Sequence, residues 1–434
     1  MNWIFMKRFF LLIAFLGCIG NMYSFAPITF FEPWNTNLRT PVWRQSDGSY
    51  VPFKVGVNFE SGSTSDSHNF RGESSELGAL YHDAEDTLAM LLGELRTPEI
   101  AAVADDDIFF ELLTVDPDPD RGKVRFNGRF EGYNFNLFAQ YYFDFCDIPG
   151  LFDIGVYLPI VSREIKYVRM LDLTKNVTTL DRTIRLRITM RAKELAQKLG
   201  NLEVGDFKKS GIGDLAVIFA WHHEYPQFRK QIENVRLTAR VGVTFPTAGG
   251  KDEDKVFSMP LGHDGAYTVP ASLGLDIFFG RGFKLGGEFE LHKWFDTTRN
   301  RRMKTLRDQT DLLLLTKGQA RKKYGSTWKI NLYGELEHIV WGLSIKTSYE
   351  FLNHGEAHIF PKSNKFNEGI VNSARQLHDW TYQSVIFQLG YDTVCSYPNA
   401  CIKPQVSFFW KVPVGQGRRI IDTTTVGVNC VFNF

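Results

Sequence analysis

Long apolar runs are scarce in this chain of 434 residues. The N-terminal run from Phe9 to Ile19 is too short to span a bilayer as a permanent helix, and no later segment holds eighteen consecutive apolar residues. A transmembrane helix needs about 20 such residues. Helical membrane spans are therefore excluded, and any membrane crossing by the rest of the chain has to use β-strands.

Cysteines and enzyme motifs are also few. The chain has five cysteines, and neither a C-x-x-C motif nor a clustered Cys/His spacing indicates zinc. The G-x-S-x-G, P-loop and H-E-x-x-H motifs are missing. We therefore expect no enzymatic activity, no metal and no cofactor.

The N-terminal segment has the layout of a secretory signal. Lys7 and Arg8 precede the apolar run, and small residues follow it. We expect removal near Ser24, which makes residues 1–24 a signal peptide and 25–52 an N-terminal periplasmic segment. Residues 27–50 could enter a barrel as a plug or form a disordered tail, and the sequence leaves both open.

Aromatic residues and glycine are abundant instead. The chain has 37 Phe, 16 Tyr, 9 Trp and 37 Gly, with 23% charged residues and a formal net charge of +1. Its mean hydropathy is −0.20. A membrane β-barrel places its apolar residues at alternate positions, so aromatic residues accumulate while the average hydropathy stays low.

Period-two segments recur along the chain and predict about twelve strands, with ten or fourteen as alternatives. They are 53–61, 124–145, 151–168, 212–223, 234–246, 266–280, 282–299, 327–339, 341–353, 379–394, 401–413 and 423–434. Tight turns alternate with long connections at about 62–123, 169–211, 247–265, 300–326, 354–378 and 414–422. This alternation predicts an all-β fold, a transmembrane antiparallel up-and-down barrel spanning 53–434. In 124–145 the apolar phase changes, which predicts a bulge at Gly132 or an extra turn.

Charged residues alternate with apolar ones in these segments. An unpaired charge facing lipid would cost about 2–4 kcal/mol at the membrane midplane, so the charges are expected to point into the barrel. The candidate pore-lining residues are Arg236, Arg240, Lys284, Glu288, Glu290, Lys329, Glu335, Lys346 and Glu350. Tryptophans at the strand ends, including Trp294, Trp328, Trp380 and Trp410, are expected to form interfacial girdles.

The last ten residues, 425–434, alternate to the end of the chain. Val426, Val428, Cys430, Phe432 and Phe434 share one face of the strand. This strand resembles the C-terminal strand of bacterial outer-membrane barrels, and the resemblance makes Val428, Phe432 and Phe434 an assembly signal for the barrel-assembly machinery. We expect the strand to pair with 53–61 and Cys430 to face lipid.

One internal stretch carries a more specific resemblance. Gly213-Asp214-Leu215 opens a strand, and Phe245-Pro246-Thr247-Ala248-Gly249 closes the next one. This resembles the outer-membrane transporter family named for the meta-pathway of phenol degradation, which is related to the FadL-like channels. The resemblance implies uptake of small hydrophobic molecules. Alternatively, these residues only start a strand and turn a loop.

The long loops are unusual in their charge. The loop 62–123 is strongly acidic, and the loops 169–211 and 300–326 are mainly basic. Opposite charge in neighbouring loops suggests that they fold over the barrel as a lid. Helical stripes support a lid: Ile184, Ile188, Leu195 and Leu199 form one, and Leu88, Leu91, Leu92 and Leu95 another. A β-extension at 184–190 is the alternative, and the basic loops could also contact lipopolysaccharide phosphates.

Two smaller predictions concern cysteine and histidine. Cys395 and Cys401 flank one tight turn, so a disulfide is possible in an oxidising compartment. Some outer-membrane barrels are hydrolases, and His338 falls on the expected lipid face, but no outward-facing serine pairs with it convincingly.

These observations predict a monomeric channel in the outer membrane of a Gram-negative bacterium. It would pass small, mainly hydrophobic solutes passively. The expected partners are outer-membrane lipid, lipopolysaccharide, the barrel-assembly machinery and the solute, with no nucleic acid. The alternative is a non-transporting barrel that displays its loops for adhesion or lipopolysaccharide contact.

Overall fold

The computed structural model of the protein describes residues 24–25, 52–95, 121–145, 148–175, 177–227, 229, 231–337, 339–340, 342–393, 402–415 and 417–434. The predicted signal peptide up to residue 23, the predicted plug at 27–50, Cys395 and Cys401 lie outside these residues. His338 and the acidic clusters between 96 and 120 lie outside them as well. The predictions made for these segments therefore stay predictions.

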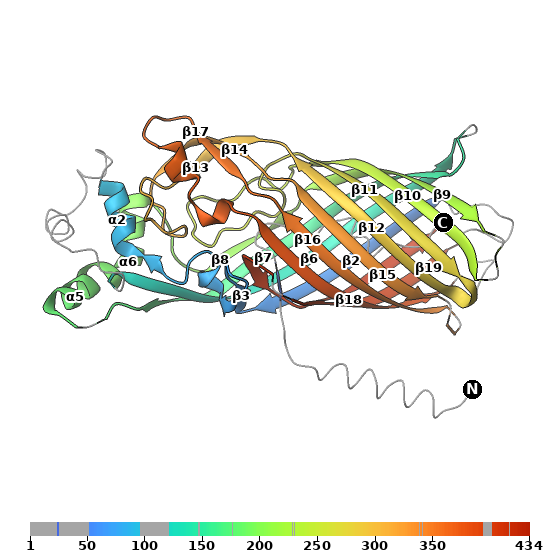
Figure 1. Cartoon of the computed structure of the whole chain (residues 1–434), viewed down its shortest axis with the longest axis horizontal. Coiled ribbons are helices and arrows are strands. Elements are labelled where there is room, and N and C mark those ends of the chain that lie inside the picture. The colour runs from blue at the N-terminus through green and yellow to red at the C-terminus, as the bar shows by residue number, and fades with distance from the viewer. Residues whose placement is uncertain are drawn as a thin grey trace, which may run out of the picture.

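Twelve antiparallel strands close into a barrel, which confirms the predicted fold class (Figure 1). They are β2(Phe53–Thr64), β6(Lys123–Asp144), β7(Leu151–Asp172), β9(Leu215–Pro226), β10(Ile232–Phe245), β11(Thr268–Phe279), β12(Phe283–Trp294), β15(Thr327–Leu336), β16(Leu343–His354), β18(Trp380–Asp392), β19(Lys403–Pro413) and β21(Thr425–Asn433). Each strand pairs with the next one of these twelve along the chain. The pairing of β2 with β21 closes the ring, as the sequence predicts.

Short turns and long connections lie at opposite ends of the barrel. The turn between β11 and β12 is the short helix η4(Gly280–Gly282), and that between β15 and β16 holds Gly342. Gly342 has φ +93°, and a Cβ added there would lie 2.0 Å from the carbonyl oxygen of Asp392. Only glycine adopts such a backbone conformation without strain. Position 342 of this turn therefore requires glycine.

The outward face of the wall is an apolar band. Side chains alternate between buried and exposed along β21, with Val426, Val428 and Phe432 exposed. Elsewhere, Leu273 is 67% exposed and Leu332 55% exposed, although both are large and apolar. In the described part of the chain, no helix is long and apolar enough to cross a membrane.

The long connections fold into a cap over one end of the barrel, opposite the C-terminus (Figure 1). One part holds β3(Asp66–His68), β4(Ser74–Glu76), η2(Leu77–Ala79), β5(Glu85–Asp86), α2(Thr87–Leu95), α5(Thr179–Ile184), η3(Arg185–Thr189), α6(Ala192–Gly200) and β8(Phe207–Ile212). The other holds β13(Thr297–Arg302), β14(Lys317–Lys323), β17(His358–Pro361), α7(Glu368–Val371), η5(Arg375–Leu377) and β20(Ile420–Asp422). β1(Ser24–Phe25) pairs with β20.

An apolar core holds the cap together. Ile184, Ile188 and Leu195 are buried in one cluster and Leu199 packs against it, so the first predicted helical stripe does pack in the lid. The second stripe is only partly correct, because Leu91 is buried and Leu88 packs against the cluster, whereas Leu92 is 37% exposed.

The β-extension at 184–190 is wrong, because the chain is helical through α5 and η3 up to Thr189. Thr178 caps the start of α5 through a reciprocal hydrogen-bonded box with Asp181. Two ion pairs join the described residues of the acidic loop to the basic loops, Arg121 to Asp181 at 2.6 Å and His82 to Asp311 at 3.3 Å, and in both the basic residue lies in the acidic loop.

The two longest strands, β6 and β7, extend beyond the barrel into the cap. The apolar phase of β6 changes because Phe126 and Phe130 point inward into the cap core, whereas Phe135 points outward from the wall. The predicted bulge at Gly132 is therefore wrong. The register shifts instead opposite Gly128, where Tyr167 of β7 has φ +58°.

Two of the tryptophans expected in the girdle face the other way. Trp294 is 2% exposed and Trp380 3% exposed, so both belong to the interior at the cap end. Trp328 and Trp410 lie on the outward face, with ring centroids 5.1 Å from Phe351 and 6.1 Å from Phe387. The girdle prediction is therefore wrong for Trp294 and Trp380, because both have the inward parity of their strands.

Candidate functional site

All nine predicted lumen residues point into the barrel. Seven of them come from three consecutive strands of the barrel, β12, β15 and β16, and β10 supplies Arg236 and Arg240. The buried members are Lys284, Glu288, Glu290, Lys329, Lys346 and Glu350, while Arg236, Arg240 and Glu335 are half-buried. Their burial agrees with the inward parity expected from the sequence, and their role in lining a pore stays a prediction.

The inward charges pair across neighbouring strands. Arg240 donates to Glu288 at 3.1 Å, and Lys329 lies 3.0 Å from Glu290. Lys284 lies 2.7 Å from Glu335. Because each of these cations has a carboxylate partner, the wall compensates its own charge, which lowers the desolvation cost of burial.

Several inward charged residues were missed by the sequence analysis. Lys54 is 1% exposed, and Lys411 lies 2.7 Å from Glu350. Asp153 and His222 form a pair at 2.7 Å. The same two-residue alternation would have found Lys54, because Val55, Val57 and Phe59 are its apolar alternates in the first strand.

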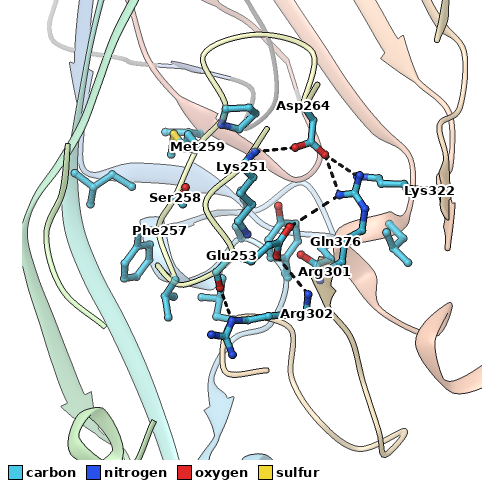
Figure 2. A pocket seen from close by; sticks show the side chains of 18 of the residues that line it. Lys251, Glu253, Phe257, Ser258, Met259, Asp264, Arg301, Arg302, Lys322 and Gln376 are labelled. Carbon is cyan, nitrogen blue, oxygen red and sulfur yellow. Dashed lines mark hydrogen bonds and ion pairs between the residues drawn. The ribbon is translucent and has the colours of Figure 1, made fainter. Parts of the chain in front are cut away.

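A second feature, a cavity of about 130 Å³, lies inside the cap (Figure 2). Phe257 and Met259 line one side of it, and the other apolar lining residues are Leu77, Leu80, Ile165, Val256, Leu312, Ile359, Leu377 and Ile421. The charged side holds five basic residues, Lys251, Arg299, Arg301, Arg302 and Lys322, with two acidic ones, Glu253 and Asp264. The cavity is thus amphipathic with an excess of positive charge.

Asp264 lies at the centre of the charged side. Arg301 donates to it at 3.1 Å, Lys322 lies 3.9 Å from it, and Arg299 also donates to it. Glu253 lies 3.3 Å from Arg299 and 4.0 Å from Arg301. Figure 2 shows Glu253 and Asp264 from the loop before β11 converging with Arg301 of β13 and Lys322 of β14.

Arg302 has a different role from the other cations. Its guanidinium donates to the carbonyl oxygens of Leu314 at 3.1 Å and Gly200 at 2.9 Å, and to the carboxylate of Asp254 at 2.9 Å. These contacts join three separate connections of the cap. Arg302 therefore stabilises the cap, and its charge is compensated by Asp254.

The pKa values of the charged side reflect the crowding of cations. Burial opposes ionisation of Asp264, but Lys322, Arg301 and Arg299 outweigh burial and hold the pKa of that carboxyl well below its usual range. Burial, with Arg301 and Arg299, lowers the pKa of Lys322 to about 8 although Asp264 opposes the shift. The single negative charge of Asp264 is thus shared among three cations, Lys322, Arg301 and Arg299, and does not neutralise all of them.

Buried aromatic rings gather at the cap ends of β12, β16 and β18. Trp294 lies at the end of β12. The ring centroids of Tyr324, His354 and His263 each lie within 5.3 Å of the Trp294 ring centroid. Tyr324 donates to Asp264 at 3.0 Å, which links this layer to the charged side of the cavity. His354 stacks on Trp380, with ring centroids 5.3 Å apart. These rings cover the cap end of the lumen.

The Gly-Asp-Leu motif connects the wall to the cap. Thr247 donates to the carbonyl oxygen of Gly213, and its own oxygen accepts from the amide of Leu215 at 3.0 Å. Asp214 accepts from Ala248 at 3.1 Å and contacts His263 at 2.8 Å. These residues hold one another and do not line the cavity, which agrees with the structural alternative for the motif.

The predicted assembly residues lie at the opposite end of the barrel. Val428, Phe432 and Phe434 are exposed on the outward face. The amide of Phe434 donates to the carbonyl oxygen of Phe53 at 2.9 Å, and the two rings lie 6.2 Å apart. Their recognition by an assembly machinery stays a prediction.

No protein-family model matches the chain, and no curated protein matches it. Among solved structures, an outer membrane channel from Pseudomonas putida is 12% identical, with 88% of this chain and 96% of that chain covered and a TM-score of 0.49. A FadL homologue from Pseudomonas aeruginosa is 8% identical, with 88% and 90% covered and a TM-score of 0.31. Outer membrane phospholipase A from Escherichia coli is 9% identical, with 88% and 97% covered and a TM-score of 0.24. Likenesses at this level say nothing about what this chain does, and the similarity to the phenol-degradation transporters rests on its motif alone.

Proposed function

We propose that the protein is an outer-membrane channel of a Gram-negative bacterium that passes small, mainly hydrophobic solutes without an energy source. The observation that carries the proposal is the partly apolar cavity in the cap, above a polar lumen inside an apolar wall. An apolar exterior with a polar interior is the arrangement of barrels in the outer membrane. The cap would take up the solute, and the lumen or a lateral gap would conduct it.

The size of the cavity favours small solutes. An engineered apolar cavity of about 150 Å³ binds benzene, and the cap cavity measures about 130 Å³. Twelve strands also give a lumen between that of eight-stranded barrels filled by side chains and that of sixteen-stranded porins. Solutes of about one ring therefore fit this route better than long chains do.

The different structures at the two ends of the barrel determine its proposed orientation in the membrane. The cap would face outward from the cell, and the short turns would face the periplasm. Exposed basic residues such as Arg321 and Lys323 on β14 would contact lipopolysaccharide phosphates. The proposed molecule acts as a monomer and without catalysis.

Uptake into liposomes tests the channel. Purified protein should let a small neutral aromatic solute, such as benzamide, enter faster than empty liposomes do. Met259→Trp, which fills the cavity, should slow entry several-fold, whereas Leu273→Trp on the outward face should not. Heat-modifiable migration on a gel would show that each variant is folded.

A surface-display role is the second candidate, because β6 and β7 extend 22 residues each and carry an elaborate cap. Folded protein that neither conducts ions in planar bilayers nor speeds solute entry would favour display and contradict the channel. Phospholipid or lipid A turnover that is lost on replacing His338 would instead indicate an enzyme.

A further inference from the structure

The charged side of the cap cavity has more donors than its own carboxylates can satisfy. Arg302 is compensated by Asp254, which leaves Lys251, Arg299, Arg301 and Lys322 against Asp264 and Glu253. Among the residues that the structure describes, no carboxylate lies within 4.0 Å of the Lys251 amine. Figure 2 shows Lys251 extending into the cavity beside Glu253. The cavity therefore presents positive charge that the carboxylates of the described residues do not neutralise.

Unused hydrogen-bond donors occur in the same place. The Nε atoms of Arg299 and Arg301 are buried without a hydrogen-bond partner among the described residues, and Arg301 is 4% exposed. Leaving a buried charged donor unsatisfied is costly, and such groups in native proteins usually have a ligand, ion or water as partner. The amine of Lys322 lies 4.7 Å from the ring centroid of Tyr324 and 3.9 Å from Asp264, beyond direct hydrogen-bond distance.

The opposite side of the cavity gives the ligand a second requirement. Val256, Phe257 and Met259 line it from one connection, and Leu77 from another. These side chains offer dispersion contacts but no hydrogen bonds. An inorganic anion would pair with the cations but would make no apolar contact with these side chains. A neutral hydrocarbon would pack against the apolar side chains but would leave the cations unpaired.

We propose that the cap cavity binds a small amphipathic anion, one aromatic ring or a short branched chain that carries a carboxylate. The carboxylate lies among Lys251, Arg299 and Lys322, and the apolar part lies against Val256 and Met259. The inference rests on the proposed function, since it names the solute class that the cap selects. The aromatic layer around Trp294 then separates the bound anion from the paired charges of the lumen.

Binding to the full-length protein in detergent tests this inference without any transport step. The probe is benzoate, compared with neutral benzamide, with acetate, which lacks the apolar part, and with inorganic phosphate. Titration calorimetry should show benzoate binding at least about tenfold more tightly than the other three, as expected for the loss of one charge-assisted hydrogen bond or of the apolar contact. Equal binding of benzoate and benzamide, or tighter binding of phosphate, would overturn it.

A matched pair of variants on one strand locates the site. Lys322 points into the cavity from β14, whereas the next residue, Lys323, is exposed on the outer side. Lys322→Gln should weaken benzoate binding about tenfold or more, and Lys323→Gln should leave it unchanged. Met259→Gln should weaken benzoate but not acetate. If Lys322→Gln and Lys323→Gln, both heat-modifiable on a gel, bind benzoate equally, the site is not this cavity.

The two proposals fail in different ways. Benzoate binding in detergent without solute entry into liposomes would remove the channel and keep the anion site. Solute entry without benzoate binding would remove the anion site and keep the channel.

Discussion

At the scale of single residues, Lys322 determines how the proposed site responds to pH. Its pKa is lowered to about 8, so the side chain is charged below that value and neutral above it. The groups that face it are Asp264, Arg299, Arg301, Glu253, Tyr324 and His354. Benzoate remains an anion throughout this range, so only the protein changes its charge.

Benzoate affinity should therefore fall as pH rises from about 7 to about 9, one unit on either side of that pKa. The fall should approach tenfold, the value of one charge-assisted contact. Calorimetry at each pH would measure it. In Lys322→Gln the affinity should be low and flat over the same range, and a steep fall in that variant would assign the titration to another group.

The residues of the cavity could not be predicted from the sequence. Asp264, Arg299 and Lys322 come from three segments that show no common spacing, and only the fold brings them together. The basic character of the loop 300–326 was visible, but its partner was expected in the acidic loop. The lumen residues were predictable because one rule, alternation along a strand, fixes the direction of each side chain.

At the scale of elements, twelve strand positions followed from the sequence because each has an apolar face and a polar face. Prediction failed where a strand left that environment. Phe126 and Phe130 enter the cap core, so their apolar face is the inward one, and a bulge was predicted where the strand is continuous. Trp294 and Trp380 were assigned to the interfacial girdle because they are tryptophans. Their odd or even positions along the strands place them on the inward face, where both are buried.

Asp214 should hold the connection between β10 and β11 in its folded conformation. It is 3% exposed and accepts hydrogen bonds from the backbone of Ala248 and from His263. Asp214→Ala leaves these buried donors unsatisfied, at about 1–3 kcal/mol each. Trypsin should then cut after Lys251 or Lys255 several-fold faster than in the unmodified protein, as measured by mass spectrometry of the fragments.

Asp206→Ala is the matched control, because Asp206 accepts one hydrogen bond, from the amide of Val168, in an exposed position. It should leave cleavage at Lys251 and Lys255 unchanged. Equal cleavage rates in the two variants would show that Asp214 does not hold this connection.

At the scale of the whole molecule, the wall separates an outer apolar surface from an inner polar one. Cys430 lies on the outward face of β21, between the exposed residues Val428 and Phe432, and is partly exposed. The labelling rate of Cys430 therefore shows whether lipid or water covers the outward face, because a thiol in lipid reacts only with reagents that dissolve in lipid.

In a variant that keeps Cys430 and replaces the other cysteines, an uncharged membrane-soluble maleimide should label the protein in liposomes. A charged maleimide should label it at least about tenfold more slowly, in keeping with the cost of placing a charge in the bilayer. Mass spectrometry would measure both rates. Equal rates in liposomes would contradict a lipid-facing β21.

The pairing of β2 with β21 also determines how such a molecule can form. These strands hold residues 53–64 and 425–433, so the contact that closes the ring joins almost the two ends of the barrel sequence. Contacts of such large sequence separation form slowly, because a long loop has to close first. Until the last strand is present, every partly formed sheet has two open edges, which are templates for wrong pairing. The chain therefore has to be kept from folding until β21 is present, because the first strand of the barrel has no closing partner before then.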